Sequence, residues 1–287
     1  MRLVSALILI GACRADQGYN DLSVDTGDGA DLASEPATDT DPAVDPGSEA
    51  LTHLDPAELC APAFDFSACA SLAPYAGPAP AVSWTYDQVG STDVTDGAGS
   101  LHGSFVGAPT VVPGVLGQGL AFDGSSWVTA ARHADLNLGS FTLMTWVKTA
   151  GGDRYDFIMS TGNGMPAWTG AGLMLDGANL AALLEGGNGG AEAIVGGGPL
   201  CADLWTHVAL SFDAGQVAIY ADGVVVGSRS LPYAAITYGA QPFAVGNDPN
   251  NTTRFLTGAV DETLVFNEAL GESAVNDVIA QQLCGSW

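Results

Sequence analysis

The stretch Trp205–Leu231, WTHVALSFDAGQVAIYADGVVVGSRSL, decides the fold of this chain. Val208, Leu210 and Phe212 fall on one face of a strand with a period of two residues, and His207 falls on the opposite face. A strand with one apolar face must pack that face against another layer of the protein. The stretch therefore predicts one member of a packed antiparallel sheet.

Two tight turns join this strand to its neighbours in the same stretch. Asp213–Gly215 forms the first turn, and Asp222-Gly223 supplies the positive-φ residues that a two-residue hairpin needs before the chain returns at Val224. A meander of this kind is not stable alone, because its apolar face needs a second sheet to cover it. The stretch therefore predicts a two-sheet sandwich.

The sequence on both sides supplies more strands of similar length. Phe141–Lys148 (FTLMTWVK) alternates most clearly, whereas 93–103 is rich in turn residues. The other expected strands begin with Trp84–Asp87 and include 107–113, 120–122, 126–129, 157–160, 172–176, 179–184, 193–195, 243–246 and 256–266. Apolar residues recur at helical spacing only near the end, from about Gly271 to Leu283, and this helix should dock on the outside of the sandwich.

Composition and charge narrow the class of partner. The 287 residues include 38 Gly and 15 Pro, a content typical of turns and strands. Acidic residues outnumber basic ones by 32 to 7, so the formal charge is -25. Phosphates would be repelled, so no nucleic-acid partner is expected, and divalent cations are the more natural counterions.

The first residues predict export. Residues 1–12 join a basic start to a short apolar run that is too short for a permanent membrane helix. Ile10-Gly11-Ala12-Cys13 resembles the bacterial lipobox, which implies a lipoprotein-type signal peptide, a lipid on Cys13 and a place in the cell envelope at the outer membrane or cell surface. The alternative is an ordinary secretory signal cut nearby, with the mature protein secreted.

The next segments divide the chain further. Residues 13–58 are acidic and poor in large apolar residues, and they predict a disordered linker that holds a domain away from a membrane. A low-affinity calcium-binding tail is the alternative for this segment. Residues 59–80 form a cysteine-containing lead-in, and residues 81–287 form the domain.

Four cysteines follow Cys13, and an even number in an exported domain suggests two disulfides with three possible connectivities. None has the spacing of a zinc site or a redox motif. The nearness of Cys60 to Cys69 favours a local bridge, which leaves Cys201 to clamp the C-terminal segment through Cys284. The sequence does not settle the pairing.

A succession of short motifs over about residues 81 to 283 resembles the LamG-like jellyroll family, the laminin-G-type group of the concanavalin A-like lectin/glucanase superfamily. The motifs are, in order, Trp84-Thr85-Tyr86-Asp87, Leu101-His102-Gly103, 117–124 (GQGLAFDG), Phe141-Thr142-Leu143, Trp146-Val147, 205–209 (WTHVA), 220–223 (YADG), 258–262 (GAVDE) and 268–272 (EALGE). The resemblance implies an all-β fold in which two antiparallel sheets form a jelly-roll sandwich, used for binding, adhesion or display.

Catalytic motifs are missing from the sequence, so we expect no enzyme. Glycan-cleaving members of the superfamily carry paired carboxylates on one strand, whereas the closest pair here, Asp261-Glu262, is adjacent and should point to opposite faces. No Gly-x-Ser-x-Gly motif occurs near a helix start. His102 and His207 are interpreted as core or turn residues that are satisfied by hydrogen bonds.

Calcium is the one cofactor that the resemblance suggests, as a structural ion. Asp87, Asp123 and Asp261 lie at motif positions where carboxylates could converge with loop carbonyls. The alternative is that Asp123 only forms a turn before glycine and that Asp261 only caps the last strand.

The expected ligand site lies on loops that carry aromatic and amide side chains. Tyr155, Trp168, Asn247, Asp248 and Asn250 are the candidates, because an aromatic ring can stack on a sugar while amides and carboxylates bond its hydroxyls. Alternatively, Trp168 only covers a sheet edge and the asparagine-rich loop only turns. The favoured function is an exported binding or adhesion module for carbohydrate or an envelope protein, ahead of a passive structural domain and a glycan hydrolase.

Overall fold

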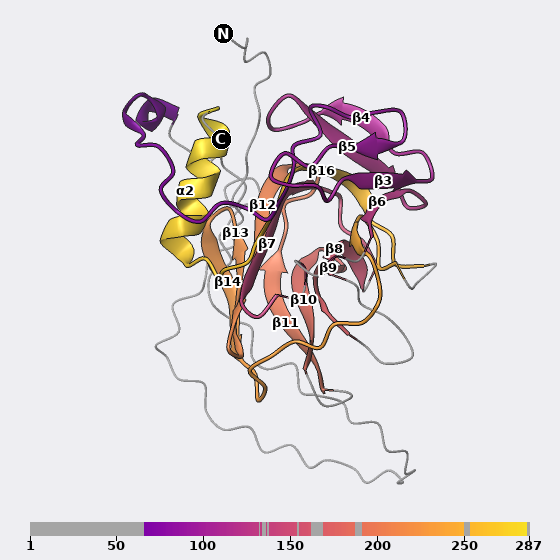
Figure 1. Cartoon of the computed structure of the whole chain (residues 1–287), viewed down its shortest axis with the longest axis vertical. Coiled ribbons are helices and arrows are strands. Elements are labelled where there is room, and N and C mark those ends of the chain that lie inside the picture. Colours follow the sequence, from indigo (N-terminus) through magenta and orange to yellow (C-terminus); the bar gives the residue numbers. More distant parts are fainter. Residues whose placement is uncertain are drawn as a thin grey trace, which may run out of the picture.

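The computed structural model describes residues 66–131, 133, 136, 138–153, 155–161, 169–186, 191–249 and 253–285. The signal peptide, the linker, Cys13 and Cys60 therefore lie outside the described residues. The described chain forms two eight-stranded sheets that face each other, with one helix outside them (Figure 1). The predicted all-β antiparallel sandwich is confirmed.

The first sheet, called sheet A here, is built around the meander and the strand FTLMTWVK. Its strands in spatial order are β14 (Val224–Ser230), β13 (Gln216–Ala221), β12 (Trp205–Asp213), β7 (Phe141–Lys148), β16 (Thr257–Phe266), β5 (Gln118–Asp123) and β4 (Thr110–Pro113), with β1 (Val82–Trp84) paired to β16. Ala214, Gly215, Asp222 and Gly223 all have positive φ angles, between 46° and 89°. Both predicted hairpin turns are thus confirmed.

The second sheet, called sheet B here, takes most of the remaining strands. In spatial order they are β11 (Ala191–Pro199), β10 (Asn179–Gly186), β9 (Ala171–Asp176), β8 (Asp156–Ser160), β15 (Phe243–Val245), β6 (Trp127–Ala130), β3 (Gly103–Val106) and β2 (Asp93–Val94). β2 and β3 lie in or beside the stretch that was expected to be only turns. Two residues are too short to show an alternation, which is why β2 left no pattern in the sequence.

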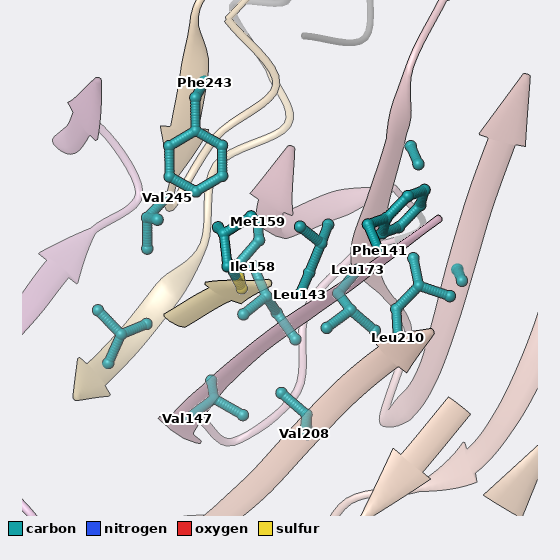
Figure 2. Packing of buried hydrophobic residues seen from close by; sticks show 14 of the residues in the cluster. Phe141, Leu143, Val147, Ile158, Met159, Leu173, Val208, Leu210, Phe243 and Val245 are labelled. Atoms are coloured by element: carbon teal, nitrogen blue, oxygen red, sulfur yellow. The ribbon is translucent and has the colours of Figure 1, made fainter. Parts of the chain in front are cut away.

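The main core fills the space between the sheets. Figure 2 shows side chains of β7 and β12 facing those of β8, β9 and β15, and every one of them is fully buried: Phe141, Leu143, Val147, Val208 and Leu210 from sheet A, and Ile158, Met159, Leu173, Phe243 and Val245 from sheet B. The apolar face predicted for β12 is therefore the inner face of sheet A. Close packing of these rings and branched chains fixes the distance between the two sheets.

The expected β-strand at 84–87 ends early, at Trp84. Tyr86 has a φ of 59°, in the left-handed region, so the chain leaves the extended conformation there. The Tyr86 ring is nevertheless fully buried, and its hydroxyl lies 2.7 Å from Oγ1 of Thr263. Trp84 and Tyr86 are both buried, which produced the alternation in the sequence, but the chain turns between them and does not continue as a strand.

Helix α2 (Glu272–Leu283) packs on the outer face of sheet A, as the sequence predicts (Figure 1). Its residues Val275 and Val278 are fully buried against the outward side chains of the sheet, which include Met144 and Leu264. The indole N–H of Trp146 donates to Oε1 of Gln282 at 3.0 Å. In the part of the chain that the structure describes, no helix is long and apolar enough to cross a bilayer.

The disulfide pairing differs from the favoured one. Cys69, in the 3-10 helix η1 (Phe66–Ser71), is bonded to Cys284 at the end of α2, with 5.3 Å between their Cα atoms. The predicted clamp between Cys201 and Cys284 is therefore wrong. Cys201 is also disulfide-bonded, and its partner lies outside the described residues.

The reason for this pairing is the packing of the lead-in segment on α2. The side-chain N–H of Gln281 donates to the carbonyl oxygen of Ala73 at 2.5 Å, so η1 is held beside the last turn of the helix. Cysteines 215 residues apart meet there. Nearness in the sequence, which favoured a bridge from Cys60 to Cys69, carries no information about such a contact.

Candidate functional site

Three polar and aromatic side chains meet where β8 begins and β16 approaches. Nη1 of Arg254 lies 3.3 Å from Oδ2 of Asp248, and the guanidinium carbon lies 4.7 Å from the centre of the Tyr155 ring. The Asp248 side chain is 2% exposed and the Arg254 side chain 15%. A buried carboxylate thus holds a partly exposed guanidinium against an aromatic face.

Backbone constraints bring these residues together. Tyr155 has a φ of 73°, and its N–H donates to the carbonyl of Leu175 at 2.9 Å, which fixes the turn into β8. Gly246 has a φ of 92°, and a Cβ at this position would lie 2.9 Å from the Phe122 ring. Only glycine fits there without displacing the ring, so this residue sets the path of the chain into Asn247 and Asp248.

Asn247 adds a buried acceptor to the cluster. The residue is 1% exposed, and its Oδ1 has no hydrogen-bond partner in the described structure. Burying an amide oxygen without a partner costs about 1–3 kcal/mol. Asn247 therefore lies beside the cluster in sequence, with a buried amide oxygen that does not reach the surface.

Aromatic side chains extend the surface beyond Tyr155. The rings of Trp127 and Phe255 are 5.4 Å apart, and both residues are partly exposed. On the face of sheet B that is turned away from the main core, Phe157, Met174, Ala181 and Leu183 form a smaller buried cluster, and Tyr155 packs against it.

The carboxyl group of Asp156 lies next in sequence to Tyr155 and points into the turn. Its Oδ2 accepts the N–H of Asp153 at 2.8 Å. Burial raises the pKa of Asp156 above its usual value, and the negative charge of Asp153 acts in the same direction, although the backbone hydrogen bond opposes them. Asp156 is therefore a structural acceptor of the turn.

The structure brings together three of the five residues predicted for ligand binding. Tyr155 and Asp248 both contact Arg254, and Asn247 precedes Asp248 in the same segment. Trp168 and Asn250 lie outside the described residues. The sequence analysis missed Arg254, although an arginine in a chain with only 7 basic residues was a usable signal.

The three aspartates predicted for calcium do not converge on one point. Asp87 and Asp261 both hold the loop before β5: Asp87 Oδ1 accepts the N–H of Gln118 at 2.9 Å, and Asp261 Oδ2 accepts the N–H of Leu116 at 3.0 Å. Asp123 lies at the other end of β5, where its Oδ1 accepts hydrogen bonds from Ser125 and Ser126.

These three residues therefore do not fit a calcium ion as one ligand set. Over the described residues, no group of three or more His, Cys, Asp or Glu side chains is close enough together to hold a metal ion. Asp123 is a turn former, which was the alternative interpretation. Asp261 lies inside β16, at a shift in register between Asp261 and Leu264, rather than capping the strand.

Asp261 and Glu262 form a buried acidic pair at the shift in register of β16. Burial raises the pKa of Asp261 well above its usual value, and the neighbouring Glu262 raises it further, whereas backbone hydrogen bonds from Leu116 and Glu262 act against this. Glu262 has a φ of 50°, so the alternation of faces is broken at this point. Asp261 is occupied by backbone donors, and its role is to anchor the loop.

The two histidines differ in their surroundings. His102 Nδ1 accepts the N–H of Asp96 at 3.0 Å, so its interpretation as a hydrogen-bonded turn residue is confirmed. His207 is fully buried under α2, edge-on to Trp146, and neither ring nitrogen has a hydrogen-bond partner in the described structure. The prediction that hydrogen bonds satisfy it was wrong, and burial lowers its pKa to about 3.

Comparisons with known proteins agree with this architecture. Residues 122–276, more than half of the chain, match a laminin-G-type family model described as the concanavalin A-like lectin/glucanases superfamily. Adhesion G-protein coupled receptor V1 of Danio rerio is 26% identical over 148 residues, which cover 49% of this chain and 2% of the receptor.

Two solved structures share the fold at low identity. Domain 4 of AbnA, an extracellular arabinanase from Geobacillus stearothermophilus solved with arabinotriose, has a TM-score of 0.52 and 20% identity, covering 69% of this chain and 97% of that one. The binding domain of Paraclostridial Mosquitocidal Protein 1 has a TM-score of 0.55 and 15% identity, covering 69% of this chain and 51% of that one.

Proposed function

The chain belongs to the concanavalin A-like lectin/glucanases superfamily, and from this premise we propose that it is a binding module that recognises carbohydrate through Tyr155, Asp248 and Arg254. The observation that carries the proposal is the guanidinium held between a buried carboxylate and an aromatic ring. The arrangement is preorganised, so little side-chain freedom is lost when a ligand binds.

Each part of this cluster suits a sugar. The guanidinium offers several fixed donors to hydroxyl or ring oxygens, and the partly exposed rings of Tyr155, Trp127 and Phe255 offer apolar faces to the C–H groups of a pyranose. The solved structure of the arabinanase domain with a bound oligosaccharide supports this choice of ligand class.

An envelope protein is the alternative partner, and a passive structural domain is the alternative role. A glycan hydrolase ranks last, because the carboxylate of Asp261 is engaged by the backbone N–H groups of Leu116 and Glu262. A structural calcium ion remains a prediction. Asp87, Asp123 and Asp261 do not form one ligand set for it, and a change of melting temperature in chelator would test it.

The lipobox-like Cys13 supports the proposal that a lipid holds the module in the cell envelope, and Cys13→Ala should release it from the membrane fraction.

A glycan array with the purified chain, followed by calorimetry on the best oligosaccharide, tests the binding function. Arg254→Ala should weaken binding by about tenfold or more, because hydrogen bonds to charged groups contribute about 1.5–3 kcal/mol. Arg229→Ala is the matched control, since Arg229 is exposed on β14 in the other sheet. Binding that survives Arg254→Ala unchanged would move the site elsewhere.

Tyr155→Leu gives a second readout that separates binding from folding. Tyr155 is only partly buried and leucine keeps its apolar packing, so the variant should change the melting temperature little and still bind more weakly, because it removes the aromatic face. Retention of no glycan by the wild type, together with specific capture of an envelope protein, would favour the protein partner.

A further inference from the structure

A groove of about 570 Å³ opens on the outer face of sheet A. Its lining includes Val112, Ala121, Lys148, Asp203, Trp205 and Ala259, which come from β4, β5, β7, β12, β16 and the turn before β12. The small side chains of Ala121 and Ala259 leave room above the sheet. The volume lies within the range of about 300–1,000 Å³ that small-molecule sites occupy.

Lys148 is the only lysine in the chain, and it stands in this groove. In the sheet it pairs directly with Trp205 on one side and with Ala259 on the other. The side chain is exposed and forms no ion pair with any residue that the structure describes. In a protein with a formal charge of -25, an exposed cation without an acidic partner is unexpected and available to a ligand.

Asp203 is held at the same groove by its backbone. Its N–H donates to the carbonyl of Thr149 at 2.9 Å, its φ is 59°, and the turn that contains it closes with a hydrogen bond from Leu204 to Cys201. Cys201 is disulfide-bonded, which fixes this turn further. An acceptor carboxylate therefore stands beside a cation and an indole.

We infer that this groove is a second binding site, for a saccharide unit that carries a carboxylate, such as a uronic acid residue. The groove favours a ligand with an anion for Lys148, hydroxyl donors for Asp203, and apolar C–H groups for the part of Trp205, 7% of the residue, that stays exposed. A neutral sugar leaves Lys148 without its ion pair. An acidic peptide offers a carboxylate without the hydroxyl donors, and its further charges are repelled by Asp203.

Calorimetry on the full chain tests this inference with a galactose trimer in which one residue is galacturonate, called the acidic trimer here, and with the neutral galactose trimer for comparison. The acidic trimer should bind and the neutral one should bind at least about tenfold more weakly. Lys148→Gln should reduce the affinity for the acidic trimer by about tenfold and leave the melting temperature unchanged, because the side chain is exposed.

Two control variants separate this site from the one at Arg254. Arg229→Gln removes an exposed cation elsewhere on sheet A, and Arg254→Ala removes the proposed sugar site at sheet B; both should bind the acidic trimer as the wild type does. Failure of the acidic trimer to bind, equal affinity for both trimers, or unchanged binding by Lys148→Gln would each overturn the inference. So would loss of acidic-trimer binding in Arg254→Ala, whereas loss of neutral-sugar binding in that variant alone bears only on the proposed function. A short aspartate peptide that binds more tightly than the trimer would assign the groove to a protein partner instead.

Discussion

Asp222 lies in the turn between β12 and β13 and binds the backbone of His207, and burial favours the neutral form of both side chains. The backbone N–H of His207 donates to Asp222 Oδ1 at 2.9 Å, while Oδ2 of Asp222 and both nitrogens of the His207 ring have no hydrogen-bond partner in the described structure. Burial raises the pKa of Asp222 to about 7 and lowers that of His207 to about 3. Their effects on stability have opposite signs.

The pH dependence of the two groups should cancel in the wild type. Asp222 contributes stability that is lost as the pH rises from its ordinary pKa near 3.8 towards 7, because the unfolded state releases its proton first. His207 contributes stability that is lost as the pH falls from 6.5 towards 3, because only the unfolded state takes up a proton. Between about pH 4 and 6.5, folded and unfolded states therefore bind equal numbers of protons at this pair.

Asp222→Asn should reveal how the free energy of unfolding depends on pH through His207 alone, because Oδ1 of the amide still accepts the backbone N–H of His207. We expect the free energy of unfolding of this variant to fall, relative to the wild type, by at most about 1.4 kcal/mol for each pH unit below 6.5. Urea unfolding at several pH values measures it. The converse variant His207→Phe should lose stability, relative to the wild type, as the pH rises from 4 to 7; parallel curves for all three proteins would contradict the assignment.

At the scale of elements, α2 closes the outer face of sheet A. Val278→Ala removes two methyl groups from a fully buried position, so the free energy of unfolding should fall by about 1–3 kcal/mol. Asp277→Ala, at the exposed neighbouring position, should change it by less than about 0.5 kcal/mol. Thermal or urea unfolding of both variants makes the comparison, and equal effects would show that α2 is not docked as described.

Most strands and this helix could be predicted because their burial follows a period that the sequence displays. Phe141–Lys148 and the first two strands after Trp205 have the expected bounds to within a residue or two, since alternation and turn residues agree there, whereas β14 continues to Ser230, past the expected return at 224–226. The candidate site was harder to predict from the sequence, because it depends on contacts between distant segments. No local pattern indicates that Arg254 stacks on Tyr155, or that Asp261 of β16 binds the loop before β5 while Asp123 lies at the far end of β5.

At the scale of the whole molecule, one covalent link joins the lead-in segment to the end of the last helix. The double variant Cys69→Ala and Cys284→Ala should lower the free energy of unfolding by about 2–5 kcal/mol, because the unfolded chain regains the freedom that a long closed loop removes. Replacing both cysteines leaves no free thiol at this place to exchange with Cys201. An unchanged transition would show that η1 and α2 are held together without the bond.

The same link has a mechanical consequence. Tension applied to the chain on either side of Cys69 and Cys284 passes directly through the sulfur–sulfur bond, so the residues between these two cysteines, whose sequence separation is 215, bear none of the load. A single molecule stretched from outside the bridge should show no unfolding of the sandwich until the bond is reduced, after which roughly 700 Å of chain can extend. The disulfide thus closes a covalent loop that contains both sheets, and the sheets stay folded while the chain outside the loop is under tension.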